Sequence, residues 1–161
     1  MRVFHIVNAE LEFAVGDIIQ PQTHKLNCMV SRKRQIEEEL ENIRKVQFCD
    51  YPSRLECLFV CYDMGDVEFW AIQKSDIRGR VFKVLTLETT EPVYWFSANS
   101  YNMYFNSLRS DLRKACIEFW ESNNNTEINK MKDREGLTKG PSKIVEINHA
   151  IISRERGLEM I

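Results

Sequence analysis

Strand-like alternation opens this chain of 161 residues. In RVFHIV (2–7), Val3, His5 and Val7 fall on one side of an extended backbone, because successive side chains of a strand point to opposite faces. His5 therefore points in the same direction as two apolar neighbours. The segment predicts a strand at the amino terminus.

The same alternation closes the chain in KIVEINHAIIS (143–153). Ile144, Glu146 and Asn148 fall on one face by a count of two, and Val145 falls on the other. The chain thus begins and ends in predicted strands. These two strands carry His5 and Glu146, and we expect the function to lie there.

Between these strands the sequence predicts two main helices and further strands. In 32–47, Ile36, Leu40 and Ile43 recur at helical spacings, and Ser31 stands at the N-cap position. The other predicted elements are a turn, short strand and loop at 15–24, strands at 55–62, 66–72, 81–87 and 93–96, and a second helix at 100–122. This order favours an α+β fold with a split or bent, antiparallel-rich sheet over a doubly wound parallel sheet.

The length of the chain matches one domain, so we expect residues 1–161 to form a single domain. The segment 123–143 is poor in apolar residues and contains glycine and proline, so it predicts an exposed, mobile loop with a short helix at 126–133. Five basic and three acidic residues give this loop a local positive excess.

Composition limits the setting in which the fold works. The sequence has no run of about eighteen apolar residues and becomes acidic too early for a secretory signal, so we expect a cytoplasmic protein with no membrane contact. The five cysteines are odd in number, which favours reduced thiols. The formal net charge of −2 gives no global attraction to polyanions, so any such contact needs a local patch.

Motifs that would identify a chemistry are absent. The sequence has no P-loop, no dinucleotide-binding glycine fingerprint, no nucleophile elbow and no zinc-protease helix. Cys57 and Cys61 would lie about 13 Å apart on a strand, which is too far for one ion. His24 and His149 have no nearby partners in the sequence, so we expect no metal site.

Ser53 and Arg54 stand directly before a predicted strand. An arginine at the mouth of a strand suits phosphate or carboxylate oxygens, because its guanidinium makes two parallel hydrogen bonds. The alternative is a surface Arg54 that pairs with a carboxylate of helix 32–47. His5 has the alternative of a hydrogen-bonded core or edge histidine, and Glu146 that of a solvent-facing strand residue.

Several short motifs together carry a family resemblance. They are FHIV, GDII, an acidic helix that ends in IRK, PSRLECLFV, ACIEFWES and KIVEIN. With them the chain resembles a largely uncharacterised family of small bacterial and phage domains that is similar to the ADP-ribosyltransferase superfamily. The resemblance implies a split, two-sheet α+β core that binds NAD as a co-substrate.

The resemblance also implies roles for four residues. Glu146 would be the catalytic carboxylate and His5 would bond the nicotinamide-side ribose, while Ser53 and Arg54 would line the dinucleotide cleft. A carboxylate beside the sugar stabilises the positive charge that builds up as the nicotinamide–ribose bond breaks. His5, Arg54 and Glu146 should then converge on one ligand. The candidates for an aromatic platform under nicotinamide are Tyr62, Tyr94, Trp95, Phe96 and Tyr101.

The implied function is an NAD-dependent ADP-ribosyltransferase that modifies a protein or a nucleic acid. Such an enzyme would act as a toxin or a phage–host conflict effector, with an inhibitor or antitoxin as a further partner. Ile144 stands where relatives that modify arginine carry a second acidic or amide residue, which favours another acceptor. Two alternatives stay open: a non-catalytic nucleic-acid or protein binding module on the same fold, and an unrelated α+β enzyme.

Overall fold

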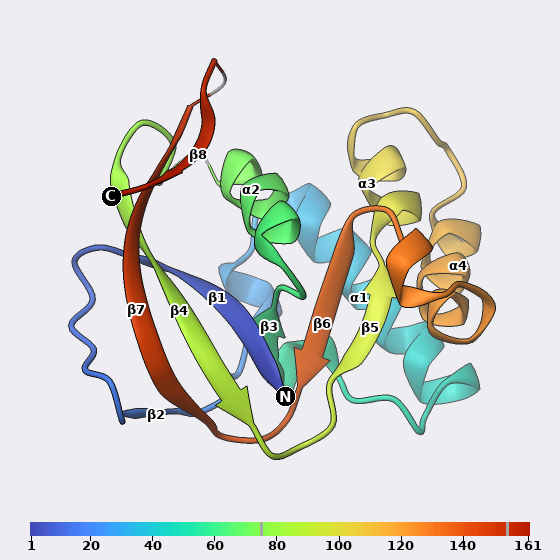
Figure 1. The fold of residues 1–161 in the computed structure, drawn as a ribbon. Helices are drawn as coiled ribbons and strands as arrows, with labels where there is room; N and C mark the ends of the chain where they lie inside the picture. The colour runs from blue at the N-terminus through green and yellow to red at the C-terminus, as the bar shows by residue number, and fades with distance from the viewer. Residues whose placement is uncertain (75, 154) are drawn as a thin grey trace. The chain divides into compact units, whose positions relative to one another are not determined.

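The computed structural model of this protein describes residues 1–74, 76–153 and 155–161. The chain forms two compact units (Figure 1). The first comprises Met1–Gln20, Phe59–Pro92 and Gly140–Ile161, and the second comprises Pro21–Leu58 and Val93–Lys139. Both units combine helices with antiparallel strands, so the predicted α+β class is confirmed.

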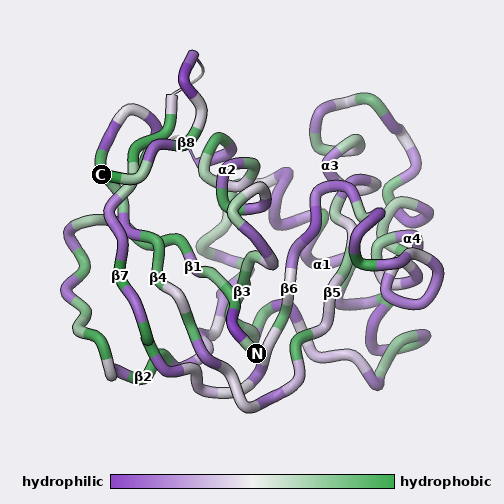
Figure 2. Tube along the Cα trace, in the orientation of Figure 1, coloured by the Kyte–Doolittle hydropathy of each residue, from purple (hydrophilic) through white to green (hydrophobic). Residues whose placement is uncertain are grey.

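The first unit is built on an antiparallel sheet in the order β1-β4-β7-β2, in which β8 also pairs with β7. Its elements are β1 (Arg2–Asn8), β2 (Ile18–Ile19), α2 (Met64–Gln73), β4 (Val81–Thr89), β7 (Ser142–Ser153) and β8 (Gly157–Met160). Hydrophobic stretches run along β1 and β4 (Figure 2). Ile6, Val84 and Ala150 form a core on one sheet face with Val67 and Ala71 of α2.

The second unit contains most of the helical structure. Its elements are α1 (Ser31–Gln47), β5 (Tyr94–Ser97), α3 (Asn99–Phe105), α4 (Leu112–Asn125), β6 (Arg134–Thr138) and the short 3-10 helices Leu26–Cys28, Arg54–Glu56 and Ile128–Lys130. The sheet order β3-β6-β5 includes β3 (Leu58–Val60), at which the two units divide the chain. Leu40 and Trp120 are fully buried, and the Trp120 indole donates to the Leu40 carbonyl at 2.9 Å.

The helix predicted at 32–47 is confirmed as α1, which buries the predicted Ile36, Leu40 and Ile43. Its N-cap is Val30, whose side chain makes no capping hydrogen bond, so the expected Ser31 cap is wrong. The strands predicted at both chain ends and at 81–87 and 93–96 are confirmed as β1, β7, β4 and β5.

The strand predicted at 66–72 is wrong, because this segment belongs to helix α2. The Asp63 side chain accepts from the Asp66 N–H at 2.9 Å and so satisfies a free donor of the first turn. Val67 and Ala71 are buried four residues apart, which is the spacing of one helix face. Val67 is buried in the core of the first unit, and Trp70 and Ile72 pack against that core.

The helix predicted at 100–122 is interrupted. It consists of α3 and α4, which are separated by residues 106–111. Ser107 in this break has a φ of 62°, and Asp111 starts α4 by accepting from the Lys114 N–H at 2.9 Å. The predicted strand 55–62 likewise shortens to the three residues of β3.

The exposed loop expected at 123–143 is wrong for its centre. α4 continues to Asn125, and β6 pairs antiparallel with β5 through residues Arg134–Thr138, all of which are buried. The polar composition of this segment led to the wrong prediction. Two of its charged side chains are buried with hydrogen-bond partners outside the strand: Arg134 donates to the Ile128 carbonyl, and Glu135 accepts from the Tyr101 hydroxyl.

Candidate functional site

Glu146 is an exposed residue on β7, where the strand contains an irregularity. Thr86 of β4 pairs with Glu146 and the next residue, Leu87, pairs with Ile144, so Val145 is an extra residue in β7. Such a bulge redirects side chains and is frequent beside active sites. It puts buried Ile144 and exposed Glu146 on opposite faces, which corrects the expectation from simple alternation that they share one face.

Asn148 orients the Glu146 carboxylate. Its side-chain amide donates to Glu146 Oε1 at 2.9 Å. The two residues are separated by one position on the strand and share a face, as the alternation predicts. Glu146 is thus a solvent-accessible carboxylate held in one orientation by a neighbouring amide.

The adjacent exposed row of the same face carries two cations. Arg2 pairs with Glu88, and Glu88 pairs with Lys143. Arg2 and Glu88 each lie two residues along their own strands from the row that contains Glu146, so their side chains point to the same face as Glu146. Lys143 pairs with Glu88 beyond the bulge and therefore shares that face. All three are exposed.

His5 lies on β1 and points to the opposite sheet face from Glu146. His5 pairs with Leu85, which pairs with Ile147, whereas Glu146 pairs with the next residue, Thr86. Adjacent rows of a sheet point to opposite faces. The expectation that His5 and Glu146 converge on one ligand is therefore wrong.

The imidazole of His5 has a partner of its own in the first unit. Its Nδ1 lies 2.8 Å from the Phe59 carbonyl. A carbonyl only accepts, so Nδ1 carries the proton of the neutral ring. Burial lowers the pKa of His5 to about 4, with a further contribution from Lys74, against the opposing effect of the Phe59 hydrogen bond. His5 is neutral at pH 7.

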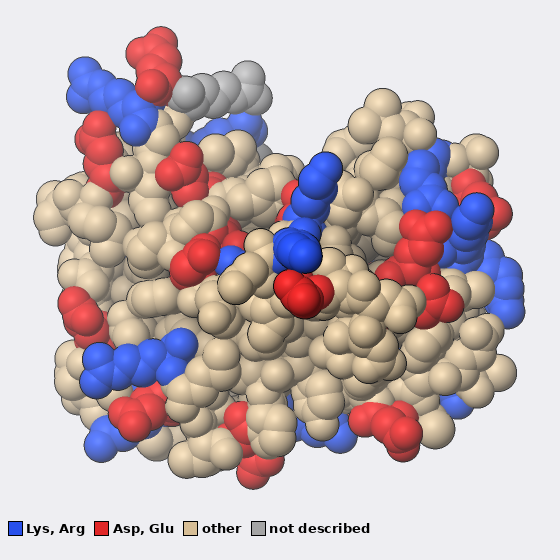
Figure 3. Space-filling view, turned by 45° about the vertical axis from the view of Figure 1, so that its right-hand side comes forward, with Lys and Arg blue, Asp and Glu red and all other residues tan. Residues whose placement is uncertain are grey.

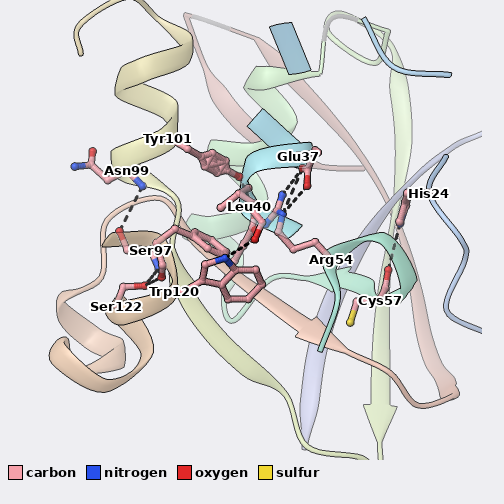
Figure 4. A network of polar contacts seen from close by, with 12 residues as sticks. His24, Glu37, Leu40, Arg54, Cys57, Ser97, Asn99, Tyr101, Trp120 and Ser122 are labelled. Atoms are coloured by element: carbon pink, nitrogen blue, oxygen red, sulfur yellow. Dashed lines mark hydrogen bonds and ion pairs between the residues drawn. The ribbon is translucent and has the colours of Figure 1, made fainter. Parts of the chain in front are cut away.

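Arg54 lies in the second unit, in a buried cluster of charges (Figure 4). Its Nε donates to Glu37 Oε2 at 3.0 Å and its Nη2 donates to Glu37 Oε1 at 2.8 Å. A second carboxylate, Glu135, forms an ion pair with Nη1. The guanidinium carbon also lies 5.2 Å from the Tyr101 ring centroid and 5.0 Å from that of Phe119. The alternative pairing of Arg54 with a carboxylate of the helix 32–47 is confirmed, although in the core rather than at the surface.

The charges in this cluster shift one another's ionisation. Burial by itself would raise the pKa of Glu37, but the Arg54 guanidinium more than offsets it, so the pKa lies below its usual value. Burial by itself would lower the pKa of Arg54, but Glu37 and Tyr101 raise it by more. The pKa therefore lies above its usual value, and this guanidinium stays charged. Burial raises the pKa of Tyr101 to about 12, against the opposing effect of Arg54. The Tyr101 hydroxyl is a hydrogen-bond donor, to Glu135 Oε2 at 2.9 Å.

Ser53 lines an open hollow of about 620 Å³ in the second unit, together with His24, Glu41 and Arg44. Its hydroxyl donates to Glu41 Oε2 at 2.9 Å and accepts from the Leu55 N–H at 3.2 Å. The bond from Leu55 caps the short 3-10 helix that carries Arg54, and the bond to Glu41 ties this cap to α1. Ser53 therefore has a local structural role, and its predicted role toward a dinucleotide stays a prediction.

The predicted aromatic candidates belong mostly to one core. Tyr51 packs edge-on against Tyr94 and Phe96, with ring centroids 5.9 and 5.2 Å away, and the ring centroids of Phe96 and Phe119 lie 4.9 Å apart. Trp95, Phe96 and Tyr101 are buried. Packing of the second unit accounts for these rings, and Tyr62 is the one candidate in the first unit.

Sequence reasoning missed the partners of the candidate residues. Asn148 could have been found, because an amide two residues from a strand carboxylate shares its face. Glu135 could not have been found, because it contacts Arg54 from a position 81 residues later in the chain (135 − 54). The described part of the chain contains no group of three or more His, Cys, Asp and Glu side chains suited to a metal ion. None of its helices is long and apolar enough to cross a bilayer.

Residues 26–150 match a family described as "Protein of unknown function (DUF2441)". This range covers more than half of the chain and takes in both Arg54 and Glu146. A search of curated proteins finds no match.

Proposed function

The chain belongs to the DUF2441 family, and we propose that it is an NAD-dependent ADP-ribosyltransferase in which Glu146 is the catalytic carboxylate. The observation that carries this proposal is the exposed Glu146 side chain, which Asn148 orients on a bulged strand. The two antiparallel sheets of the α+β fold agree with the split-sheet core that the resemblance implies.

The chemistry requires a carboxylate in this setting. The bond between the ribose C1′ and the nicotinamide nitrogen breaks, and its electron pair returns to the nicotinamide ring. The acceptor then forms a bond to C1′ with a lone pair and loses its proton to solvent or to a base. Glu146 stabilises the positive charge on the sugar between these events. Asn148 holds the carboxylate in place, so the carboxylate does not have to reorient as the bond breaks.

The residues around Glu146 also suit the phosphate part of NAD. Arg2 and Lys143 lie on the same sheet face, about 7 Å along the strands from the row of Glu146. Two cations suit a pyrophosphate, whose oxygens would compete for them with Glu88, the carboxylate that lies between them on β4. In this proposal they replace Arg54, which is engaged with Glu37 and Glu135.

His5 has no place at the ribose in this proposal, because it points to the other face of the sheet. Its neutral ring bonds the Phe59 carbonyl and stabilises the fold of the first unit. The acceptor is a macromolecule, protein or nucleic acid. A role as a toxin or phage–host conflict effector belongs to the same proposal, and growth arrest on expression of the wild type, relieved by Glu146→Gln, would support it.

The test is incubation of the full chain with labelled NAD and a mixture of cell protein, RNA and DNA. We expect label on one acceptor class with the wild type and a loss of at least about a hundredfold with Glu146→Gln. Glu159→Gln removes an exposed carboxylate from the same unit and serves as the matched control, with activity unchanged. Release of nicotinamide without a labelled macromolecule would assign a glycohydrolase instead.

A second candidate function is a binding module on the same fold without catalysis. The opposite orientation of His5 and Glu146 favours it, because the ribose partner that the resemblance implies is missing from the face of Glu146. If the folded wild type neither transfers label nor releases nicotinamide, the transferase is rejected and the binding module stands.

A further inference from the structure

The end of α3 and the loop that follows it bring exposed apolar and cationic side chains together. Phe105 is 46% exposed and Leu108 is 72% exposed. The guanidinium carbon of Arg32, near the start of α1, lies 5.3 Å from the Tyr104 ring centroid and 5.9 Å from that of Phe105. We call Arg32, Tyr104, Phe105, Ser107, Leu108 and Arg109 the Arg32 surface.

The break between α3 and α4 forms this surface. The left-handed backbone of Ser107 turns the chain away from α3, and Asp111 starts the next helix. An open hollow of about 510 Å³ lies at this break and is lined by Arg32, Tyr104, Ser107, Leu108, Arg109 and Ser110. The loop therefore holds apolar side chains beside a hollow instead of burying them.

Arg32 keeps its positive charge at this hollow. Its Nη2 donates to the Tyr104 carbonyl at 2.7 Å and to the Ser107 hydroxyl at 3.2 Å, and both acceptors are neutral. No carboxylate in the described part of the chain forms an ion pair with Arg32. Arg109, in contrast, is paired with Glu118 at 2.5 Å.

A second cation, Arg113 of α4, lies beside the face of α1 on which Arg32 stands. Arg32, Gln35 and Glu39 follow one another at spacings of three and four, so they share a helix face. Gln35 lies 3.4 Å from the Tyr104 hydroxyl, and Glu39 lies 3.5 Å from Arg113, whose side chain is 64% exposed. Such a long, exposed ion pair is weak, so Arg113 stays available to an anion. Positions 32 and 39 are about 10 Å apart along the helix.

We propose that the Arg32 surface binds single-stranded nucleic acid. Exposed rings stack on unpaired bases, and arginines that lie over rings contact both phosphates and base planes. The net charge is −2, and basic and acidic side chains are mixed over the face drawn in Figure 3, so the whole chain provides no broad positive field. Binding then depends on the local combination of rings and cations in the second unit.

Two other partners fit this surface less well. A duplex keeps its bases stacked inside and leaves Phe105 and Leu108 without a ring to contact. An acidic peptide offers carboxylates to Arg32 and Arg113 but no regular series of planar rings. The exposed apolar side chains therefore favour a single strand over both.

The experiment is fluorescence anisotropy of the full chain with labelled single strands of about 15 nucleotides, RNA and DNA, at about 50 and 200 mM salt. We expect wild-type binding that weakens with salt. Phe105→Ala should weaken it about fivefold or more, because a base loses its stacking partner. Arg32→Gln should weaken it about tenfold and reduce the salt dependence by about one phosphate contact. Arg78→Gln, which removes one exposed cation from the first unit, is the charge-matched control and should change binding less than about twofold.

Several results would overturn the proposal: no binding at low salt, equal effects of Arg32→Gln and Arg78→Gln, or equal affinity for a duplex or polyglutamate. Phe105→Ala leaves the hydrogen bonds of Arg32 to Tyr104 and Ser107 in place, so a folding defect in Arg32→Gln leaves the test intact. The measurement contains no NAD, and Glu146→Gln should bind as the wild type does. Binding and transferase activity can therefore fail independently.

Discussion

The Arg54 guanidinium and the Glu37 carboxylate form a two-point ion pair in which each residue is only 5% exposed. Glu135 forms an ion pair with the same guanidinium from β6. A buried charge without its partner carries a large desolvation cost, so these residues depend on one another. The cluster joins α1, the 3-10 helix Arg54–Glu56 and β6 in the second unit.

Arg54→Met should therefore lower the free energy of unfolding by about 3–5 kcal/mol, because it leaves two carboxylates buried without a cation. Arg113→Met removes an exposed arginine of the same unit and should change the free energy by less than about 0.5 kcal/mol. Urea titration measures both. Replacing Arg54, Glu37 and Glu135 together by apolar residues should recover much of the loss. Equal costs for the two single variants would contradict the assigned role of the cluster.

His5 should make stability depend on pH. Its folded pKa of about 4 lies below the ordinary 6.5, so the unfolded chain takes up this proton first as the pH falls. The His5 contribution is complete above pH 6.5 and is lost progressively between about pH 6.5 and pH 4, up to about 3 kcal/mol. His5→Gln should flatten the pH dependence in that window, whereas His149→Gln, at an exposed histidine, should leave it unchanged. An identical slope for wild type and His5→Gln would refute this.

Asn148 should act through Glu146 rather than through NAD. If the proposed transferase is active, Asn148→Ala should lower kcat about tenfold or more, with little change in KM for NAD, because the carboxylate loses its orienting donor. Asn8→Ala, at an exposed asparagine of β1, is the matched control. A raised KM with unchanged kcat would instead place Asn148 in direct contact with NAD.

Removal of the Asp63 cap should destabilise α2. Asp63→Ala should lower the free energy of unfolding by about 1 kcal/mol, because the Asp66 N–H loses its acceptor. Thermal unfolding followed by circular dichroism measures this change. Asp63→Asn retains a capping oxygen and should cost less, so equal losses in the two variants would count against the cap.

Thiol alkylation should separate two groups of cysteines. Cys28 and Cys49 are exposed, whereas Cys57, Cys61 and Cys116 are buried. Burial raises the pKa of Cys57 to about 11 and that of Cys116 to about 12, so both remain protonated thiols near neutral pH. Mass spectrometry after iodoacetamide treatment should find labels on the two exposed cysteines of the native protein and on all five in urea. Labelling of native Cys57 would contradict its burial.

The candidate site shows how far local patterns reach. Alternation correctly predicted that Glu146 and Asn148 share a face and that β7 is a strand. It failed to predict the bulge at Val145, because an extra residue is visible only in the pairing of β7 with β4. For Arg54 the alternative, a pair with a carboxylate of helix 32–47, was correct except that the pair is buried, and the second partner Glu135 of β6 was not predicted.

By itself the sequence determined the elements whose periodicity is strong: the terminal strands, β4, β5, helix α1 and hence the α+β class. Only the tertiary structure decided that 66–72 is a helix, that 134–138 is a buried strand and that His5 points away from Glu146. The physical reason is the range of the interactions. Side-chain periodicity acts over a few residues, whereas sheet register, buried ion pairs and the burial of polar segments depend on partners that are distant in the chain.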